Sequence, residues 1–128
     1  FPTRNPKKAL PVKKTTMFLI ENPQREFLLQ QRPPSGVWGG LWSFPEGEDA
    51  TTAFEHLLAS PAKIATQQNL QEFRHTFTHF HLDISPIHVK LAEIPLTVGE
   101  QALRWFAPSA PDEIGLTKPV TRLLKEIG

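Results

Sequence analysis

The first candidates for chemistry in this sequence are three closely spaced histidines, His75, His79 and His81. A His-x-His pair on a β-strand presents two imidazoles on one side, an arrangement that suits zinc. Asp83 falls on the same side of such a strand, but no carboxylate stands clearly in the place of a third ligand. A turn between the first two histidines, argued below, would also separate them. We therefore expect no metal site and interpret the histidines as hydrogen-bonding or DNA-facing groups.

A second candidate is a set of carboxylates for a metal-dependent nucleotide hydrolase. Gly40, Glu46 and Glu55 have the spacing of the opening of the Nudix box, whose glutamates bind divalent metal from one side of a helix. The motif also requires an arginine and a pair of glutamates, and those positions hold Phe54, Leu58 and Ala59. Since apolar side chains do not bind metal ions, the pattern predicts a Nudix-like framework without pyrophosphate hydrolysis.

Two further segments, Arg32–Pro45 and Phe73–Ile84, combine aromatic rings, glycines, arginines and imidazoles without pairing a nucleophile with a base. Such side chains stack on nucleic-acid bases and hydrogen-bond to their edges, while arginine contacts phosphate. Most of the large rings are expected in the core instead, namely Trp38, Trp42, Phe44 and Phe73. Thr78 and His79 differ, because polar groups at the tip of a turn are exposed and available for binding.

The position of that turn follows from the period-two alternation of side chains along a strand. Apolar residues lie at odd positions up to Phe77, and at even positions from Phe80 to Ile84. One uninterrupted strand cannot hold both sets on one face, so a turn or a bulge must reset the register between them. Thr78-His79 is therefore predicted to be the tip of a hairpin, or a bulge that turns these side chains outward.

Other strands are expected at Thr15–Glu21, Glu26–Arg32 and Leu103–Phe106, where short apolar runs rich in strand formers lie between turn signals. The first two are expected to form a hairpin across an Asn-Pro turn. After the Thr-His turn the parity of the apolar residues changes again at Ser85-Pro86, and the proline predicts a strand at a sheet edge.

Two helices are expected. One begins at Asp49 or Thr51 and ends at about Ala59, before a proline. The other follows Thr117 and carries an apolar stripe made of Val120, Leu123, Leu124 and Ile127. Strands with interspersed helices predict an α+β fold, a Nudix-like mixed β-sheet packed by about two helices.

Composition sets the remaining limits. The length of 128 residues indicates one domain, and 39% hydrophobic residues suffice for a core. No apolar run has the length of a membrane span or the form of a signal peptide, so a soluble, intracellular domain is expected. The absence of cysteine excludes a disulfide framework and thiolate-bound zinc or iron–sulfur sites within this chain.

Charge is unevenly distributed along the chain. The net charge is only +1, yet five of the 14 lysines and arginines fall within the first 14 positions. This proline-containing arm, residues 1–14, is expected to be an extended basic connector between domains. The start at Phe1 rather than methionine suggests that the sequence is a piece of a longer protein.

The two aromatic segments carry a resemblance to a known family. Arg32–Pro45 (RPPSGVWGGLWSFP) and Phe73–Leu82 (FRHTFTHFHL) closely resemble patterns in the C-terminal domain of adenine DNA glycosylases, the MutY family. Gly115–Leu124 resembles the closing pattern of the same domain. Together the motifs span nearly the whole chain. One departure is Thr78, which stands where the family usually has serine.

The resemblance implies a Nudix-like domain over residues 15–128 that recognises 8-oxoguanine paired with adenine in double-stranded DNA. In the family a Phe-Ser-His loop at a hairpin tip reaches the oxidised base, which corresponds here to Phe77, Thr78 and His79. Thr78 keeps the hydroxyl group, with an extra methyl group and a stiffer χ1. Contacts with the DNA backbone are expected from Arg74, Arg32, Lys13 and Lys14.

The family's catalytic carboxylates and its [4Fe-4S] cluster belong to a separate N-terminal domain, which is the implied partner of this one. No catalytic residue, metal or cofactor is expected in this chain, which alone should cleave nothing. The parent protein is expected to be a monomeric adenine glycosylase, a hydrolase of N-glycosidic bonds in base excision repair, in the bacterial cytoplasm and associated with the nucleoid. Two alternatives stay open, a free-standing Nudix-type nucleotide pyrophosphohydrolase and a protein-interaction domain without base contact.

Overall fold

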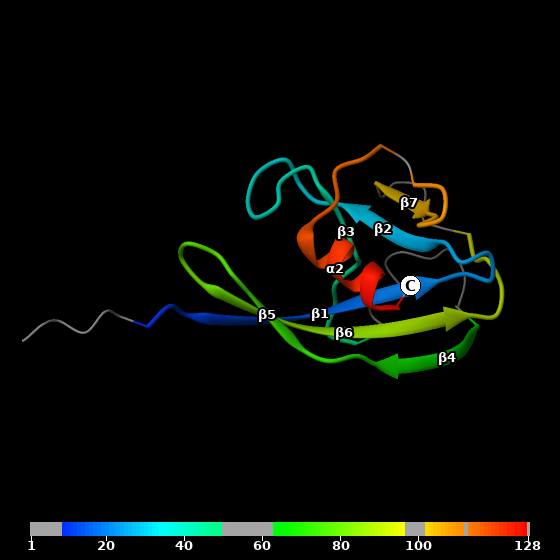
Figure 1. Ribbon diagram of the computed structural model, residues 1–128, viewed down its shortest axis with the longest axis horizontal. Helices are drawn as coiled ribbons and strands as arrows, with labels where there is room; N and C mark the ends of the chain where they lie inside the picture. Colours follow the sequence, from blue (N-terminus) through cyan, green and yellow to red (C-terminus); the bar gives the residue numbers. More distant parts are fainter. Residues whose placement is uncertain (1–8, 50–62, 97–101, 112, 128) are drawn as a thin grey trace, which may run out of the picture.

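The computed structural model describes residues 9–49, 63–96, 102–111 and 113–127. Within these ranges the chain forms seven strands and one helix (Figure 1). The elements in chain order are β1 (Val12–Glu21), β2 (Phe27–Gln31), β3 (Trp42–Ser43), β4 (Ile64–Asn69), β5 (Phe73–Thr76), β6 (His81–Leu91), β7 (Leu103–Phe106) and α2 (Lys118–Ile127).

All seven strands belong to one mixed sheet. Its main order is β3-β2-β1-β6-β4, while β5 also pairs with β6 and β7 with β2. The central pair, β1 and β6, is parallel from Val12 opposite His81 to Glu21 opposite Lys90, and the other pairs are antiparallel. A mixed sheet with a packed helix confirms the predicted α+β fold class.

The middle of this sheet is buried on both faces. On β1, Met17 and Leu19 point into one hydrophobic cluster, while Phe18 and Ile20 point into a second cluster on the opposite face. All four side chains are fully buried. A strand covered on both sides needs no polar alternation, which explains the continuous apolar run at residues 17–20 of β1.

The C-terminal helix covers the first of these faces (Figure 1). Val120 and Leu123 of α2 are fully buried in the first cluster, and Leu124 and Ile127 pack against it, as the apolar stripe predicts. The carbonyl of Thr117 accepts hydrogen bonds from the backbone N–H groups three and four residues later, at 3.1 and 3.3 Å, which confirms this residue as the N-cap.

The helix predicted between Asp49 or Thr51 and Ala59 lies outside the described residues. In the ranges that are described, no helix is both long and apolar enough to cross a membrane.

Strand β1 begins three residues earlier than the sequence predicts. Lys13 and Lys14, assigned above to the connector, lie in this strand opposite Leu82 and Asp83 of β6. The cause is the length of β6, because the backbone N–H and C=O groups of its first residues need hydrogen-bonding partners. Residues just before Thr15 supply them: the N–H of His81 donates to the carbonyl oxygen of Pro11 at 2.9 Å.

The prediction that Pro86 marks a sheet edge is wrong, because β6 has partners on both sides. Its first half pairs with β5 and its second half with β4, and Pro86 falls between the two pairings. Its carbonyl oxygen accepts the N–H of Leu70 on that side. Since N and C=O of one residue point to the same side of a strand, the missing N–H of Pro86 costs the β1–β6 ladder nothing.

The apolar residues of β6 change from even to odd positions near Pro86, but the strand is not interrupted there. The even-numbered Ile84 belongs to the first hydrophobic cluster, whereas the odd-numbered Val89 and Leu91 belong to the second. One continuous strand therefore contributes to the first face near its start and to the opposite face near its end.

Substitution of Leu123 tests the packing of α2. We expect Leu123→Ala to lower the free energy of unfolding by about 2–5 kcal/mol, because the side chain is fully buried and its loss leaves a cavity. Urea denaturation measures the change. The control, Thr121→Ala, alters an exposed residue of the same helix and should stay within about 0.5 kcal/mol of the unsubstituted chain. Equal effects of the two variants would contradict this packing.

Candidate nucleic-acid interface

The hairpin of β5 and β6 extends away from the core, beside the first residues of β1, and ends in an exposed tip (Figure 1). The last paired residues are Thr76 and His81. Between them, the N–H of Phe77 donates to the carbonyl oxygen of Phe80 at 2.8 Å and closes the turn. Thr78 and His79 are both exposed. The position of the turn deduced from side-chain parity is thus confirmed.

The tip rests on a group of four rings, which we call the ring cluster: Trp38, His75, Phe77 and Phe80. Centroids are 5.2 Å apart between Trp38 and His75, 4.9 Å between Trp38 and Phe77, and 4.7 Å between Phe77 and each of the other two rings. Each edge-to-face or offset contact of this kind contributes about 0.5–1.5 kcal/mol beyond the burial of area. The cluster joins the hairpin to the loop that carries Trp38.

That loop, residues 33–40, holds Trp38 in an unusual backbone conformation. The φ angle of Trp38 is 53°, in the left-handed region that bulky residues rarely adopt. Its carbonyl oxygen accepts the N–H of Leu41 at 3.1 Å. Such a conformation persists only where surrounding contacts fix it, and here the indole also packs on two rings of the hairpin.

Close backbone packing fixes the same loop from inside. The N–H of Gly40 donates to the carbonyl oxygen of Pro33 at 3.0 Å. A Cβ atom added at Gly39 would lie 2.4 Å from the carbonyl oxygen of Pro34. This distance is a steric clash, and the backbone would have to move to remove it. Only glycine fits at this position without displacing the loop next to Trp38.

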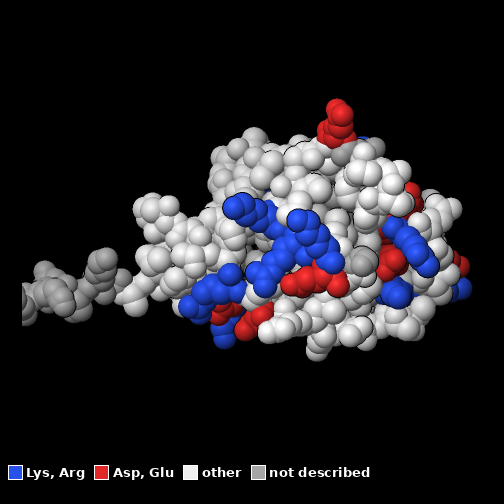
Figure 2. Space-filling model, in the orientation of Figure 1, with Lys and Arg blue, Asp and Glu red and all other residues white. Residues whose placement is uncertain are grey.

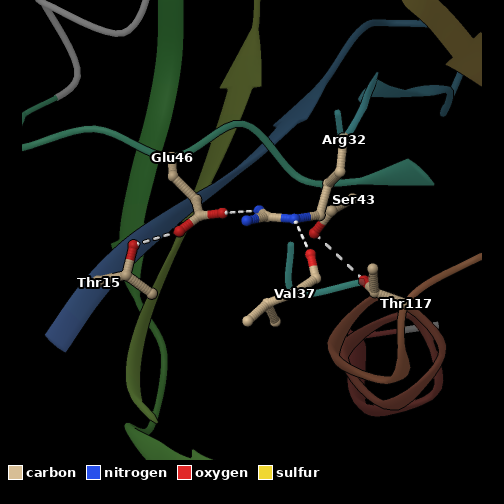
Figure 3. A network of polar contacts seen from close by, with 6 residues as sticks. All are labelled: Thr15, Arg32, Val37, Ser43, Glu46 and Thr117. Atoms are coloured by element: carbon tan, nitrogen blue, oxygen red, sulfur yellow. Dashed lines mark hydrogen bonds and ion pairs between the residues drawn. The ribbon is translucent and has the colours of Figure 1, made fainter. Parts of the chain in front are cut away.

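Arg32 connects this loop to the sheet (Figure 3). Its Nε donates to the carbonyl oxygen of Val37 at 2.9 Å, and its Nη1 donates to the carboxylate of Glu46 at 2.6 Å. The hydroxyl of Thr15 on β1 donates to the other oxygen of Glu46 at 2.6 Å. Arg32, a predicted contact of the DNA backbone, therefore has two internal partners. So does Glu46, which matches the Nudix pattern.

Arg74 is also predicted to contact the DNA backbone, and it too is paired with a carboxylate, within the hairpin. Its Nε and Nη2 donate to the two carboxylate oxygens of Asp83 at 2.7 and 3.2 Å. The hydrogen bonds from Arg74 hold the pKa of Asp83 below its ordinary value of 3.8, with a smaller contribution from the charge of Lys14. A bidentate pair across the two strands fixes their register close to the tip.

The two lysines lie where they can reach a ligand at the hairpin. Lys13 is exposed, and its Nζ stands 4.6 Å from the centroid of the Phe80 ring, a cation–π distance. Lys14 is exposed on the neighbouring position of β1, opposite Asp83. Both positive charges therefore flank the hairpin of β5 and β6.

The turn separates the histidines that suggested a metal site. His75 is opposite Leu82, and His81 is opposite Thr76, so the two imidazoles lie on opposite faces of the hairpin. His81 Nδ1 is hydrogen-bonded to the hydroxyl of Thr76 at 2.8 Å. In the described ranges no three histidines, aspartates or glutamates come together in a way that could hold a metal ion.

The exposed tip is suited to binding a ligand by hydrogen bonds. In the described part of the chain, the side chains of Thr78 and His79 have no hydrogen-bonding partner, so the hydroxyl and the imidazole can bind a ligand. The rings beneath them keep the tip in place. Phe77, predicted to reach the base, is half-buried in the ring cluster. Glu55 and the positions of the remaining Nudix carboxylates lie outside the described residues.

Sequence comparisons identify relatives along nearly the whole chain. The NUDIX domain family matches residues 16–126. An adenine DNA glycosylase from Buchnera aphidicola subsp. Acyrthosiphon pisum is 32% identical over 98% of this chain and 36% of its own length. A second adenine DNA glycosylase, from Buchnera aphidicola subsp. Baizongia pistaciae, is 28% identical over 97% of this chain and 35% of its own length. The chain thus spans about a third of the length of these relatives.

Solved structures share the fold at low sequence identity. The C-terminal domain of mouse MUTYH, crystallised in complex with human PCNA, has a TM-score of 0.73 at 18% identity, over 89% of this chain and 86% of that chain. A MutT NUDIX hydrolase from Burkholderia pseudomallei has a TM-score of 0.64 at 19% identity, over 91% of this chain and 98% of that chain.

The ring cluster predicts an unusual titration of His75. Burial lowers the pKa of His75 below its ordinary value of 6.5, and the charge of Lys118 lowers it further. We expect Trp38→Ala to raise this pKa toward 6.5 and Lys118→Gln to raise it less. An NMR titration of the imidazole protons, assigned with His75→Gln, measures these shifts.

The same titration affects folding stability. On lowering the pH, His75 takes up its proton in the unfolded chain before it does so in the folded one, because its pKa is lower in the folded state. The free energy of unfolding should therefore fall as the pH decreases from 6.5 to the folded-state pKa of His75. A folded-state pKa at or above 6.5 would contradict the described burial of this ring.

A double-mutant cycle tests the connection through Arg32. We expect Arg32→Gln and Glu46→Gln to show a coupling free energy of about 0.5–1 kcal/mol, since both side chains are partly exposed. The matched control is the exposed pair Arg122 and Glu126 on α2, 3.4 Å apart, for which about 0.3–0.5 kcal/mol is expected. Additive effects at Arg32 and Glu46 would show that the two residues do not act together.

Proposed function

The chain belongs to the NUDIX domain family, and from this premise we propose that it is the lesion-recognition and DNA-binding domain of an adenine DNA glycosylase. In this function the domain detects 8-oxoguanine opposite adenine in a duplex. The observation that carries the proposal is the exposed hydroxyl–imidazole pair, Thr78 and His79, at the tip of a braced hairpin. The homology to adenine DNA glycosylases over 98% of the chain supports it.

The chemistry of the lesion explains what this pair would recognise. Oxidation of guanine adds a carbonyl group at C8 and a hydrogen at N7, so a hydrogen-bond acceptor becomes a donor. The hydroxyl oxygen of Thr78 or an unprotonated ring nitrogen of His79 can accept that hydrogen bond. Guanine offers no such donor at N7. One contact of this kind discriminates by about 1–3 kcal/mol, roughly ten- to a hundredfold.

The contribution of Phe77 would be indirect. Its ring packs against Trp38, His75 and Phe80. It therefore supports the two residues that follow it and fixes the direction in which they point. Lys13, beside the same rings, supplies positive charge for the phosphates near the lesion.

Arg32 and Arg74 are better suited to supporting the site than to binding phosphate. Each guanidinium is already hydrogen-bonded to a carboxylate, Glu46 for the first and Asp83 for the second. A phosphate would have to compete with these partners. We assign both arginines a positioning role.

Excision of adenine would be performed by another part of a longer protein. That protein would act on DNA in a bacterial cell. The relatives are about three times as long as this chain, which leaves room for a catalytic domain. The iron–sulfur cluster that the family resemblance implies would also lie there, because this sequence has no cysteine to bind iron. The chain alone should therefore have no glycosylase activity.

Substitutions at the tip test the proposed function. We expect Thr78→Ala/His79→Ala to lower the preference for an 8-oxoguanine:adenine duplex over a guanine:adenine duplex by roughly ten- to a hundredfold. Fluorescence anisotropy with the 128-residue chain measures binding. Single-turnover adenine release by the full protein measures the same preference during catalysis. Unchanged discrimination in both assays would overturn the assignment.

Two controls accompany this test. Gln67→Ala/Gln68→Ala alters two exposed polar residues on β4 and should leave the preference unchanged. The chain should also release no pyrophosphate from 8-oxo-dGTP with magnesium. Release at an enzymatic rate would favour the alternative function, a nucleotide hydrolase.

A further inference from the structure

A basic surface, which we call the basic groove, lies between α2 and β5 of the hairpin that carries Thr78 and His79, the recognition hairpin. Phe73, Arg74 and His75 form one wall. The other wall comes from α2, with Lys118, Arg122 and Lys125 among its residues. Figure 2 shows lysine and arginine side chains gathered over this part of the molecule. Neither the predicted site residues nor the ring cluster accounts for the three basic residues of the helix.

The three basic residues of α2 form a row along one side of the helix. Lys118, Arg122 and Lys125 are related by i, i+4 and i+7 steps, which lie on one face of an α-helix. With a rise of about 1.5 Å per residue, the row spans roughly 10 Å. Long basic side chains spaced in this way can contact neighbouring phosphates of one DNA strand.

The groove carries an excess of positive charge. All three residues of the row are exposed. Arg122 is 3.4 Å from Glu126, and its guanidinium also lies 4.1 Å from the centroid of the Phe73 ring, which orients it toward β5. Across the described ranges, no carboxylate forms an ion pair with Lys118 or Lys125. Among the described residues that line the groove, Glu126 is the one acidic residue.

The groove is continuous with the recognition hairpin. His75 belongs both to the ring cluster and to the groove wall, and the charge of Lys118 is close enough to lower its pKa. A duplex whose base lies at Thr78 and His79 would therefore bring neighbouring phosphates toward α2. Groups that neutralise phosphates beside a base-reading loop fix the register of the duplex without reading its sequence.

We propose that the basic groove binds the phosphate backbone of the same duplex, with Lys118 and Lys125 as its principal contacts and Arg122 oriented by Phe73. This inference rests on the proposed function, since it takes DNA as the ligand. It adds a contact that holds damaged and undamaged DNA equally. The tip then supplies the discrimination, and the groove supplies affinity.

Salt dependence of binding separates these two contributions. The logarithm of the association constant falls linearly with the logarithm of salt concentration, and each phosphate contact contributes about 0.9 to the steepness of this line. We therefore expect Lys118→Gln/Lys125→Gln to make the slope shallower by about two. Affinity should fall by the same factor for 8-oxoguanine:adenine and undamaged duplexes. Anisotropy with the 128-residue chain and with the full protein provides both quantities.

The matched control removes the same charge elsewhere. Lys63→Gln/Lys90→Gln alters two exposed lysines at the other end of the sheet, on or next to β4 and β6, and should leave the slope unchanged. Thermal unfolding of each variant shows whether it is folded. An equal loss of slope in this control would mean that only net charge matters, and would overturn the groove as a site.

The outcomes distinguish the groove from the proposed function. If the tip variant loses lesion preference while Lys118→Gln/Lys125→Gln keeps the full slope, the groove proposal fails and the proposed function stands. If the groove variant loses slope while the tip variant keeps its preference, lesion reading fails and the groove stands as a DNA contact. Absence of duplex binding by both the chain and the full protein would overturn both.

Discussion

The parallel pairing of β1 with β6 is the constraint on which the rest of this structure depends. Over the central residues it buries both faces of the sheet, because successive side chains point into opposite hydrophobic clusters. Over the first residues the same pairing continues beyond the core, where β6 also pairs with β5. The hairpin is thus supported by a third strand up to Thr76 and His81, and only the turn at residues 77–80 extends beyond the paired strands.

Much of this fold could be predicted from the sequence, because its main signals are local. The hairpin turn follows from a change of parity, β7 from a short apolar run, and the stripe of α2 from helical spacing. Strand β4 gave no such signal, since all six of its residues, IATQQN, are exposed at an edge of the sheet. The role of Pro86 was misjudged for a related reason. A proline is tolerated inside a sheet where two partner strands meet, and the local sequence does not record where they meet.

The candidate site was predictable in part for the same physical reason. Thr78 and His79 could be placed at a tip from residues within a few positions of them. The support of that tip could not, because Trp38 and Phe77 are distant in sequence, and so are Arg32 and Glu46. These contacts exist only once the sheet has brought the loop and the hairpin together. The basic groove was hidden as well, since its helical lysines look like an ordinary solvated face until β5 is placed opposite them.

The loop that carries Trp38 has a consequence for how variation in this domain would present itself. A side chain at Gly39 would collide with the backbone of Pro34, so the backbone of this loop would have to move beside Trp38, whose indole packs on the hairpin. The β-sheet and both hydrophobic clusters would remain. A substitution at Gly39 would therefore act on the exposed tip indirectly, through the loop and the ring cluster.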